Sequence, residues 1–242
     1  MPPSLTRRAF LSAAASTALA AVAAPSLASA AASAAPVPAR SAPTGAPASW
    51  YIPDNPEAQA FRQQWNLSCE VASFKIVLIH YHLSAVTEEL LQDLLGFDEN
   101  PNKGFRGDYR ALSTHGLTNY GAHAPALAKL IARFPRPGMF NPVPLANLDE
   151  IRAAISRNWL VMPWIPVALE PSRRVALEMS DGAWVSLVPG EHVIVLHGYD
   201  PSGFFTYDPR PTPRVPGYVG AAALDKGMSL FEAPALAIQP LF

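Results

Sequence analysis

The sequence has very little cysteine and few charged residues. Cys69 is the only cysteine among 242 residues, and 15% of the residues are charged. A single cysteine excludes a disulfide framework within the chain. The 18 basic and 19 acidic side chains give a formal net charge of -1, and no long run of like charge occurs. The chain therefore lacks the electrostatic footprint of a nucleic-acid-binding protein, and we expect no nucleic acid among its partners.

Acidic residues are absent from the first 48 positions, which are rich in alanine and proline. This stretch has too few large apolar side chains to build a core. Arg7 and Arg8 precede an apolar run that ends in the small-residue pattern Ala28-Ser29-Ala30, the order typical of an export signal. The arginine pair resembles a twin-arginine signal, which predicts the twin-arginine export machinery as a partner. An N-terminal membrane anchor is the alternative, but the run is short and alanine-rich for a bilayer span.

We therefore divide the chain into an export signal (1–30), an Ala/Pro-rich linker (31–49) and one domain (50–242). The third part suits a single domain with one sizeable core. Beyond the signal, no apolar segment approaches bilayer length without proline or charge. We expect an exported protein, periplasmic or extracellular, without stable membrane insertion after signal removal.

Helical patterns come first in the domain. Apolar residues recur every three or four positions from Cys69 to His80, with Ser68 or Asn66 as candidate cap. Three further helices are predicted, over Thr87–Leu95, Ala124–Phe134 and Asn147–Asn158. The turn-rich stretch Asn100–Asp108 between them predicts an ordered loop that supports the neighbouring structure.

Strand patterns follow. Trp159–Val167 is apolar and extended, but its two prolines predict an edge or bulged strand. His192–Asp200 and Phe204–Asp208 flank a short turn at Pro201–Gly203, which predicts an antiparallel hairpin. Helices followed by strands favour an α+β fold with an antiparallel sheet.

Cys69 is the first candidate for chemistry. An unpaired thiol in an exported protein is bridged to another molecule, buried and inert, or reactive. At the first turn of a helix, unpaired N–H groups and the helix dipole favour the thiolate, so we expect a lowered pKa and a reactive thiol.

A nucleophilic thiol also needs a base, a group that orients the base, and a donor for the oxyanion. His192 opens one strand of the predicted hairpin and Asp208 closes the other, so a carboxylate would lie beside an imidazole. Gln63 lies six residues before Cys69, where its amide could turn toward the carbonyl under attack. Gln64 is an alternative donor.

Five blocks of sequence, in this order, resemble the papain-like cysteine peptidases of the bacteriocin-processing type, in a stand-alone exported form. Besides Gln63 they are NLSCEVA (66–72), NPNKGFRG (100–107), YGAHAPAL (120–127), GEHVIVLHGYD (190–200) and YDP (207–209). The resemblance implies the papain-like fold and hydrolysis of a peptide or related amide through an acyl-enzyme. It implies that Cys69 is the nucleophile, His192 the general base and acid, Asp208 the orienting residue and Gln63 the oxyanion donor. The substrate would be a peptide or cell-envelope component.

Bacteriocin-processing peptidases are usually fused to a transporter, and they cut a leader peptide after paired small residues. We expect no transporter in this chain, so this cleavage specificity does not carry over. Position 123 is His where the family often has an aromatic residue; packing is favoured over a substrate contact. Trp164 and Trp184 are more readily explained by core or strand packing than by a substrate groove.

Other kinds of site fit the sequence less well. Closely spaced Cys and His pairs for zinc and glycine-rich phosphate loops are absent, so we expect neither metal nor organic cofactor. Two alternatives to hydrolysis stay open: acyl transfer to an amine, and a non-catalytic module that binds peptide or cell-wall fragments.

Overall fold

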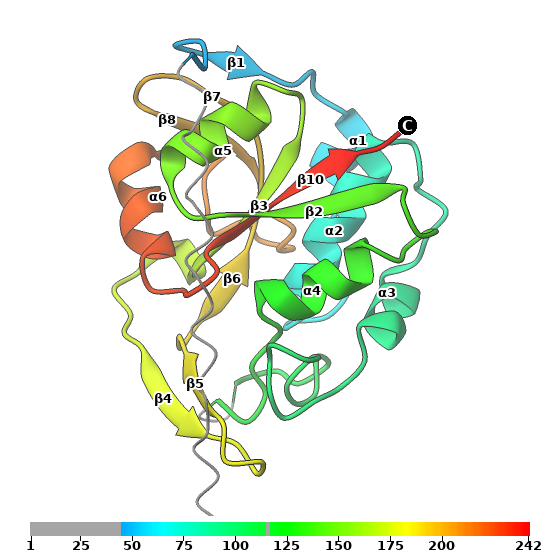
Figure 1. The fold of residues 1–242 in the computed structure, drawn as a ribbon, viewed down its shortest axis with the longest axis vertical. Helices are drawn as coiled ribbons and strands as arrows, with labels where there is room; N and C mark the ends of the chain where they lie inside the picture. Colours follow the sequence, from blue (N-terminus) through cyan, green and yellow to red (C-terminus); the bar gives the residue numbers. More distant parts are fainter. Residues whose placement is uncertain (1–44, 115–116) are drawn as a thin grey trace, which may run out of the picture. The chain divides into compact units, whose positions relative to one another are not determined.

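The computed structural model describes residues 45–114 and 117–242 (Figure 1). The predicted export signal and most of the predicted linker lie outside these residues. Within them, helices surround a mainly antiparallel sheet. The helices are α1 (Pro56–Ala60), α2 (Cys69–His80), α3 (Glu88–Leu95), α4 (Ala124–Ile131), α5 (Leu148–Ile155) and α6 (Ala221–Met228), with a 3-10 turn, η1, at Val167–Leu169.

The main sheet has eight strands, of which six follow the order β2-β10-β3-β7-β8-β9; β1 pairs with β7, and β6 pairs with β3. A separate two-stranded sheet joins β4 to β5. The strands are β1 (Trp50–Tyr51), β2 (Phe140–Leu145), β3 (Leu160–Pro166), β4 (Val175–Glu178), β5 (Trp184–Leu187), β6 (Glu191–Val193), β7 (Val195–Tyr199), β8 (Gly203–Tyr207), β9 (Tyr218–Gly220) and β10 (Ala235–Pro240).

Two of the four predicted helices, α3 and α5, begin at side-chain caps. Thr87 Oγ1 accepts from the Leu90 N–H (3.2 Å), and Gly96 ends α3 with a φ of +73°. Asn147 caps α5 by accepting from two N–H groups of its first turn. The helices predicted over Ala124–Phe134 and Asn147–Asn158 are shorter than expected, because each ends in turns rather than in a further helical turn. The α+β fold predicted from the order of elements is confirmed.

The prediction of an edge strand at Trp159–Val167 is wrong. β3 is fully buried and lies inside the sheet, between β10 and β7. Its prolines are tolerated because Pro163 is the last residue paired with β10, and Pro166 ends the strand opposite Glu191.

The predicted hairpin forms between β7 and β8, but the first of its strands is interrupted at Ile194. The residues before the interruption form β6, which pairs with β3 rather than with β8. Because of this break, His192 lies on β6, which pairs with β3, whereas β7 pairs with both β3 and β8.

α2 is the buried centre of the molecule. Its residues from Cys69 to Ile79 are all buried, and it contacts β3, β6 and β7 on one side and α1 and α3 on another. α3 and α4 lie with it to the right in Figure 1, whereas α5 and α6 form a second group on the left. Among the described residues, no helix combines the length and apolarity that a bilayer span requires.

Candidate active site

The N-terminus of α2 places Cys69 beside the sheet. Ser68 occupies the cap position predicted for it, but its side chain does not cap the helix. Instead, Ser68 Oγ lies 2.9 Å from Trp65 O and 2.5 Å from Glu88 Oε1. Glu88 Oε2 also accepts from the Gln64 N–H at 3.0 Å. The loop that leads into Cys69 is therefore held by one buried carboxyl group of α3.

β6 lies against the same end of α2. The Ser73 hydroxyl donates to Val193 O at 2.9 Å. Because Val193 follows His192, this contact holds the histidine strand against the cysteine helix.

His192 and Asp208 are joined as the hairpin predicts. The Nε2–H of His192 donates to Asp208 Oδ1 at 2.8 Å, and both side chains are buried. Asp208 also accepts backbone N–H groups from Arg210 (3.0 Å), Arg214 (2.8 Å) and Val215 (2.9 Å). Burial opposes ionisation of Asp208, but the hydrogen bonds and the charge of the imidazole outweigh it and lower the pKa to about 2.

The tautomer of His192 follows from this pairing. An ionised carboxylate can only accept, so Nε2 carries the proton, and Nδ1 is the basic nitrogen of the neutral ring. Nδ1 is buried and has no hydrogen-bond partner among the described residues. The ring thus keeps one free nitrogen at the end of the sheet that meets α2.

The thiol of Cys69 does not behave as its helix position predicts. The side chain is 6% exposed, and its Sγ–H donates to Glu70 Oε2 at 3.5 Å. Burial raises the pKa of the thiol well above its usual value, and the Glu70 and Glu191 carboxyls raise it further. The expectation of a lowered thiol pKa is therefore wrong, because desolvation and two nearby acids oppose the helix N-terminus.

Glu70 and Glu191 form a buried acid pair beside the thiol. The Ala122 N–H donates to Glu70 Oε1, whereas neither carboxyl oxygen of Glu191 has a hydrogen-bond partner among the described residues. Burial raises the pKa of both side chains, and the charge of Glu70 raises that of Glu191 further. Gly121, with a φ of +149°, leaves the space between them: a Cβ there would lie 2.4 Å from an oxygen of each.

These three side chains are also the group that could hold a metal ion. One donor atom each from Cys69, Glu70 and Glu191 lies within 4.8 Å of the others. Metal binding requires deprotonated ligands, whereas burial favours the protonated form of all three. In the described state, Cys69 and Glu70 are hydrogen-bonded to each other, whereas Glu191 lies beside them without a hydrogen-bond partner among the described residues.

The structure separates the two candidate oxyanion donors. Gln63 is 4% exposed, and its amide N–H groups donate to Trp65 O (2.7 Å) and Asn66 O (3.1 Å). Gln64 is exposed, and only its backbone N–H bonds inward. Gln63 is therefore the residue built into the site, although it must release one loop carbonyl before it can donate to a substrate.

Comparison with protein families places the chain. A model of the Peptidase_C39-like family matches residues 57–218, a range that contains Gln63, Cys69, His192 and Asp208. The chain belongs to the Peptidase_C39-like family. It is a cysteine peptidase with the papain-like α+β fold that its sequence predicts.

A solved structure shows the same fold for this Peptidase_C39-like chain. A C39-like peptidase from Bacillus anthracis superposes with a TM-score of 0.64 at 20% identity, covering 78% of this chain and 96% of the other. Xylellain, a cysteine protease from Xylella fastidiosa, gives a TM-score of 0.47 at 13% identity, covering 82% and 88%. A search of the curated proteins finds no match.

Two residues of the Peptidase_C39-like site were missed by sequence reasoning: Glu70 and Glu191. Each stands next to a residue that the sequence singles out, in the blocks that contain Cys69 and His192. An acidic residue inside an otherwise apolar helix or strand is rarely buried without a partner. The position of each glutamate in an apolar segment was therefore the signal that could have found it.

Proposed function

We propose that the protein is an exported cysteine peptidase that hydrolyses peptide or related amide bonds through an acyl-enzyme on Cys69. The observation that carries this proposal is the His192–Asp208 hydrogen bond, which leaves His192 Nδ1 without a partner among the described residues, on the strand β6 that contacts α2. The helix begins with the only thiol of the chain. Export is supported by the twin-arginine-like sequence near Arg7 and Arg8.

The raised pKa of Cys69 decides how the first step runs. The resting site holds a neutral thiol rather than a preformed thiolate. His192 Nδ1 therefore takes the proton while the sulfur attacks the carbonyl carbon, as a general base. Asp208 keeps the ring oriented and stabilises the imidazolium that forms.

The remaining steps return the site to its starting state. The oxyanion lies near the first N–H groups of α2, which have no intrahelical acceptors, and near the Gln63 amide. The imidazolium gives its proton to the leaving amine, and a thioester to Cys69 remains. Water then attacks the thioester, His192 takes a proton from the water, and the thiol is released as the carboxylic acid forms.

The proposal predicts different effects for the two neighbouring glutamines. With peptides that the parent chain cleaves, Gln63→Ala should lower kcat by about 10²- to 10³-fold, because an oxyanion donor is lost. Gln64→Ala should stay within about threefold of the parent, because its side chain points to solvent. Cys69→Ala gives the inactive baseline. Equal effects of the two glutamine substitutions, or cleavage by Cys69→Ala, would overturn the assignment.

A further inference from the structure

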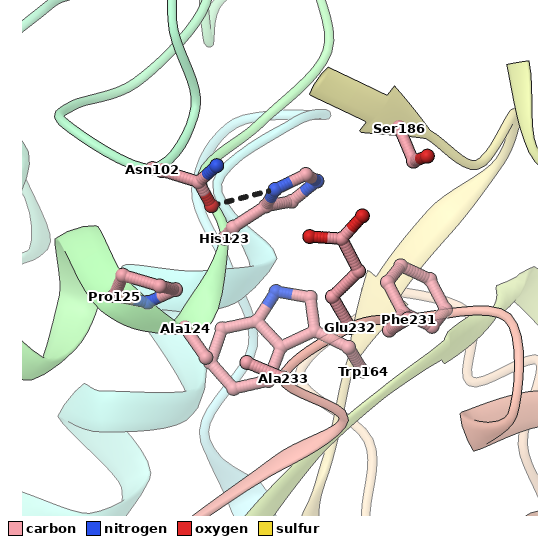
Figure 2. Close-up of a pocket in the computed structure, with 9 residues that line it drawn as sticks. All are labelled: Asn102, His123, Ala124, Pro125, Trp164, Ser186, Phe231, Glu232 and Ala233. Atoms are coloured by element: carbon pink, nitrogen blue, oxygen red, sulfur yellow. Dashed lines mark hydrogen bonds between the residues drawn. The ribbon is translucent and has the colours of Figure 1, made fainter. Parts of the chain in front are cut away.

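A cavity lies beside the N-terminus of α4. It has a volume of about 190 Å³, and its wall includes Trp164, Phe231, Ala124 and Ala233 on the apolar side and His123 and Glu232 on the polar side. Figure 2 shows the Glu232 carboxylate projecting into the space between His123 and Phe231. The cavity therefore combines apolar walls with one acidic group.

The polar side of this cavity is fixed by a hydrogen-bond chain. The Val188 N–H donates to the Tyr120 hydroxyl at 3.0 Å, and the Tyr120 O–H donates to His123 Nε2 at 3.1 Å. The His123 Nδ1–H donates to Asn102 Oδ1 at 3.1 Å (Figure 2). Burial lowers the pKa of His123 to about 4, so the ring is neutral at pH 7.

Glu232 is consequently the charged group of the cavity. Its carboxylate has no hydrogen bond or ion pair with any residue in the described ranges, and the neutral His123 cannot balance it. An apolar ligand that excluded water from this carboxylate would leave a charge without a partner, which is costly. A ligand with an aliphatic stem and a positive head satisfies both the walls and the carboxylate.

The cavity shares a wall with the nucleophile. Ala122 donates its N–H to Glu70, the neighbour of Cys69, and accepts from the Trp164 indole N–H at 2.9 Å. His123, the next residue, lines the cavity. Trp164 also pairs with Val193, which follows His192. An extended peptide advances about 3.3–3.6 Å per residue, so three residues span about 10 Å. The substrate residue that enters the cavity is therefore sought within three positions of the scissile bond.

We propose that this cavity is a specificity subsite that accepts a lysine or arginine side chain of the peptide substrate, with Glu232 as the residue that recognises its charge. The proposal rests on the peptidase function above and names its substrate class. His123 then has a role in the subsite as well as in packing, because it holds the polar wall in a neutral form.

Cleavage rates test the subsite. In a set of internally quenched peptides that varies three positions on each side of the scissile bond, one position should favour Lys or Arg over norleucine by about tenfold or more in kcat/KM. Glu232→Gln should bring this ratio close to one, chiefly by lowering kcat/KM for the Lys and Arg peptides. Glu232→Lys should shift the preference to Glu. Glu178→Gln, an exposed carboxylate on β4, serves as the charge control and should keep the parent preference.

Binding without cleavage separates this proposal from the proposed function. N-acetyl-lysine methylamide and N-acetyl-norleucine methylamide differ at the ammonium group, and each is titrated against the Cys69→Ala chain while the Trp164 indole resonance is followed by NMR. The lysine compound should bind about tenfold more tightly, and Glu232→Gln should remove the difference. Equal binding of the two compounds, or a lysine preference that survives Glu232→Gln, overturns the subsite. Glu232-dependent binding in a chain that cleaves no peptide keeps the subsite and overturns the peptidase mechanism instead.

Discussion

Cys69 shows how burial can outweigh a helix N-terminus. A charge near a helix end gains typically 0.3–1 kcal/mol, which is less than the roughly 1.4 kcal/mol that corresponds to one pKa unit. Full burial of an ionisable group shifts its pKa by up to about 3–5 units. Desolvation therefore determines the protonation of this thiol, and the neighbouring carboxyls act in the same direction.

Glu191 allows that balance to be tested with a small change. In Glu191→Gln the shape is kept but the side chain can no longer ionise beside the thiolate, so the thiol pKa should fall. The thiolate is the reactive form, so alkylation of Cys69 by iodoacetamide at pH 8 should be faster in Glu191→Gln than in the parent. The pH profile of the alkylation rate, measured by mass spectrometry, reports the pKa directly.

Glu178→Gln supplies a comparison in which an exposed carboxyl on β4 is neutralised. It should leave the alkylation profile unchanged. If Glu191→Gln left the profile of Cys69 where it is, or moved it to higher pH, the carboxyl cluster would not control the thiol.

The raised pKa of Cys69 also reverses the reactivity that the sequence predicts for the resting thiol. A helix-start cysteine predicts a thiol that reacts faster than free cysteine near pH 6, whereas the raised pKa indicates a slower one. The sequence could place Cys69 at a helix start, because capping and periodicity are local. It could not show that residues 1 and 122 positions further along the chain, Glu70 and Glu191, meet around the sulfur.

At the scale of elements, α3 positions the entrance to α2. Glu88 is 2% exposed and bonds to the Gln64 N–H and the Ser68 hydroxyl. Glu89, the next residue, points outward and pairs with Arg110 at 2.9 Å, where both side chains are more than half exposed. The sequence places both glutamates in the first turn of a helix, but it does not show which one turns inward.

Replacing each glutamate by alanine should therefore give unequal results. Glu88→Ala leaves the Gln64 N–H without its acceptor and removes one partner of the Ser68 hydroxyl, and it should lower the free energy of unfolding by about 1–3 kcal/mol. Glu89→Ala removes an exposed ion pair and should cost less than about 1 kcal/mol. Chemical denaturation of both variants measures the difference, and equal losses would contradict the anchoring role of Glu88. In Glu88→Ala that remains folded, the displaced loop should also lower kcat.

The elements that the sequence missed are short or late in the chain. β2 and β10 pair along six positions, yet each contains proline, and β2 carries two of them. β3 reads as an edge strand for the same reason, although its neighbours on both sides bury it. The position of a proline-containing strand in the sheet depends on partner strands that are distant in the sequence. Local patterns therefore could not predict whether such a strand lies at the edge or inside the sheet.

At the scale of the whole molecule, the fold brings four distant segments to one end of α2. The Gln63 N–H donates to Pro209 O at 2.6 Å, His192 on β6 pairs with Asp208 after β8, and β6 contacts the helix that begins at Cys69. The His192–Asp208 contact was predictable because a hairpin fixes its own register. The cavity at Glu232 was not, because its wall combines α4, β3, β5 and the segment before β10.

The central claim is that Cys69 forms the acyl-enzyme with His192 as base, and intact-mass analysis of the protein during turnover tests it most directly. With an activated ester of a lysine-containing peptide, the parent chain should gain the mass of the acyl group on Cys69 and lose it again with time. His192→Ala should gain that mass far more slowly, and Cys69→Ser should show no adduct that decays at the rate of turnover. Turnover with no adduct on Cys69, or acylation that proceeds equally fast without His192, would contradict the account.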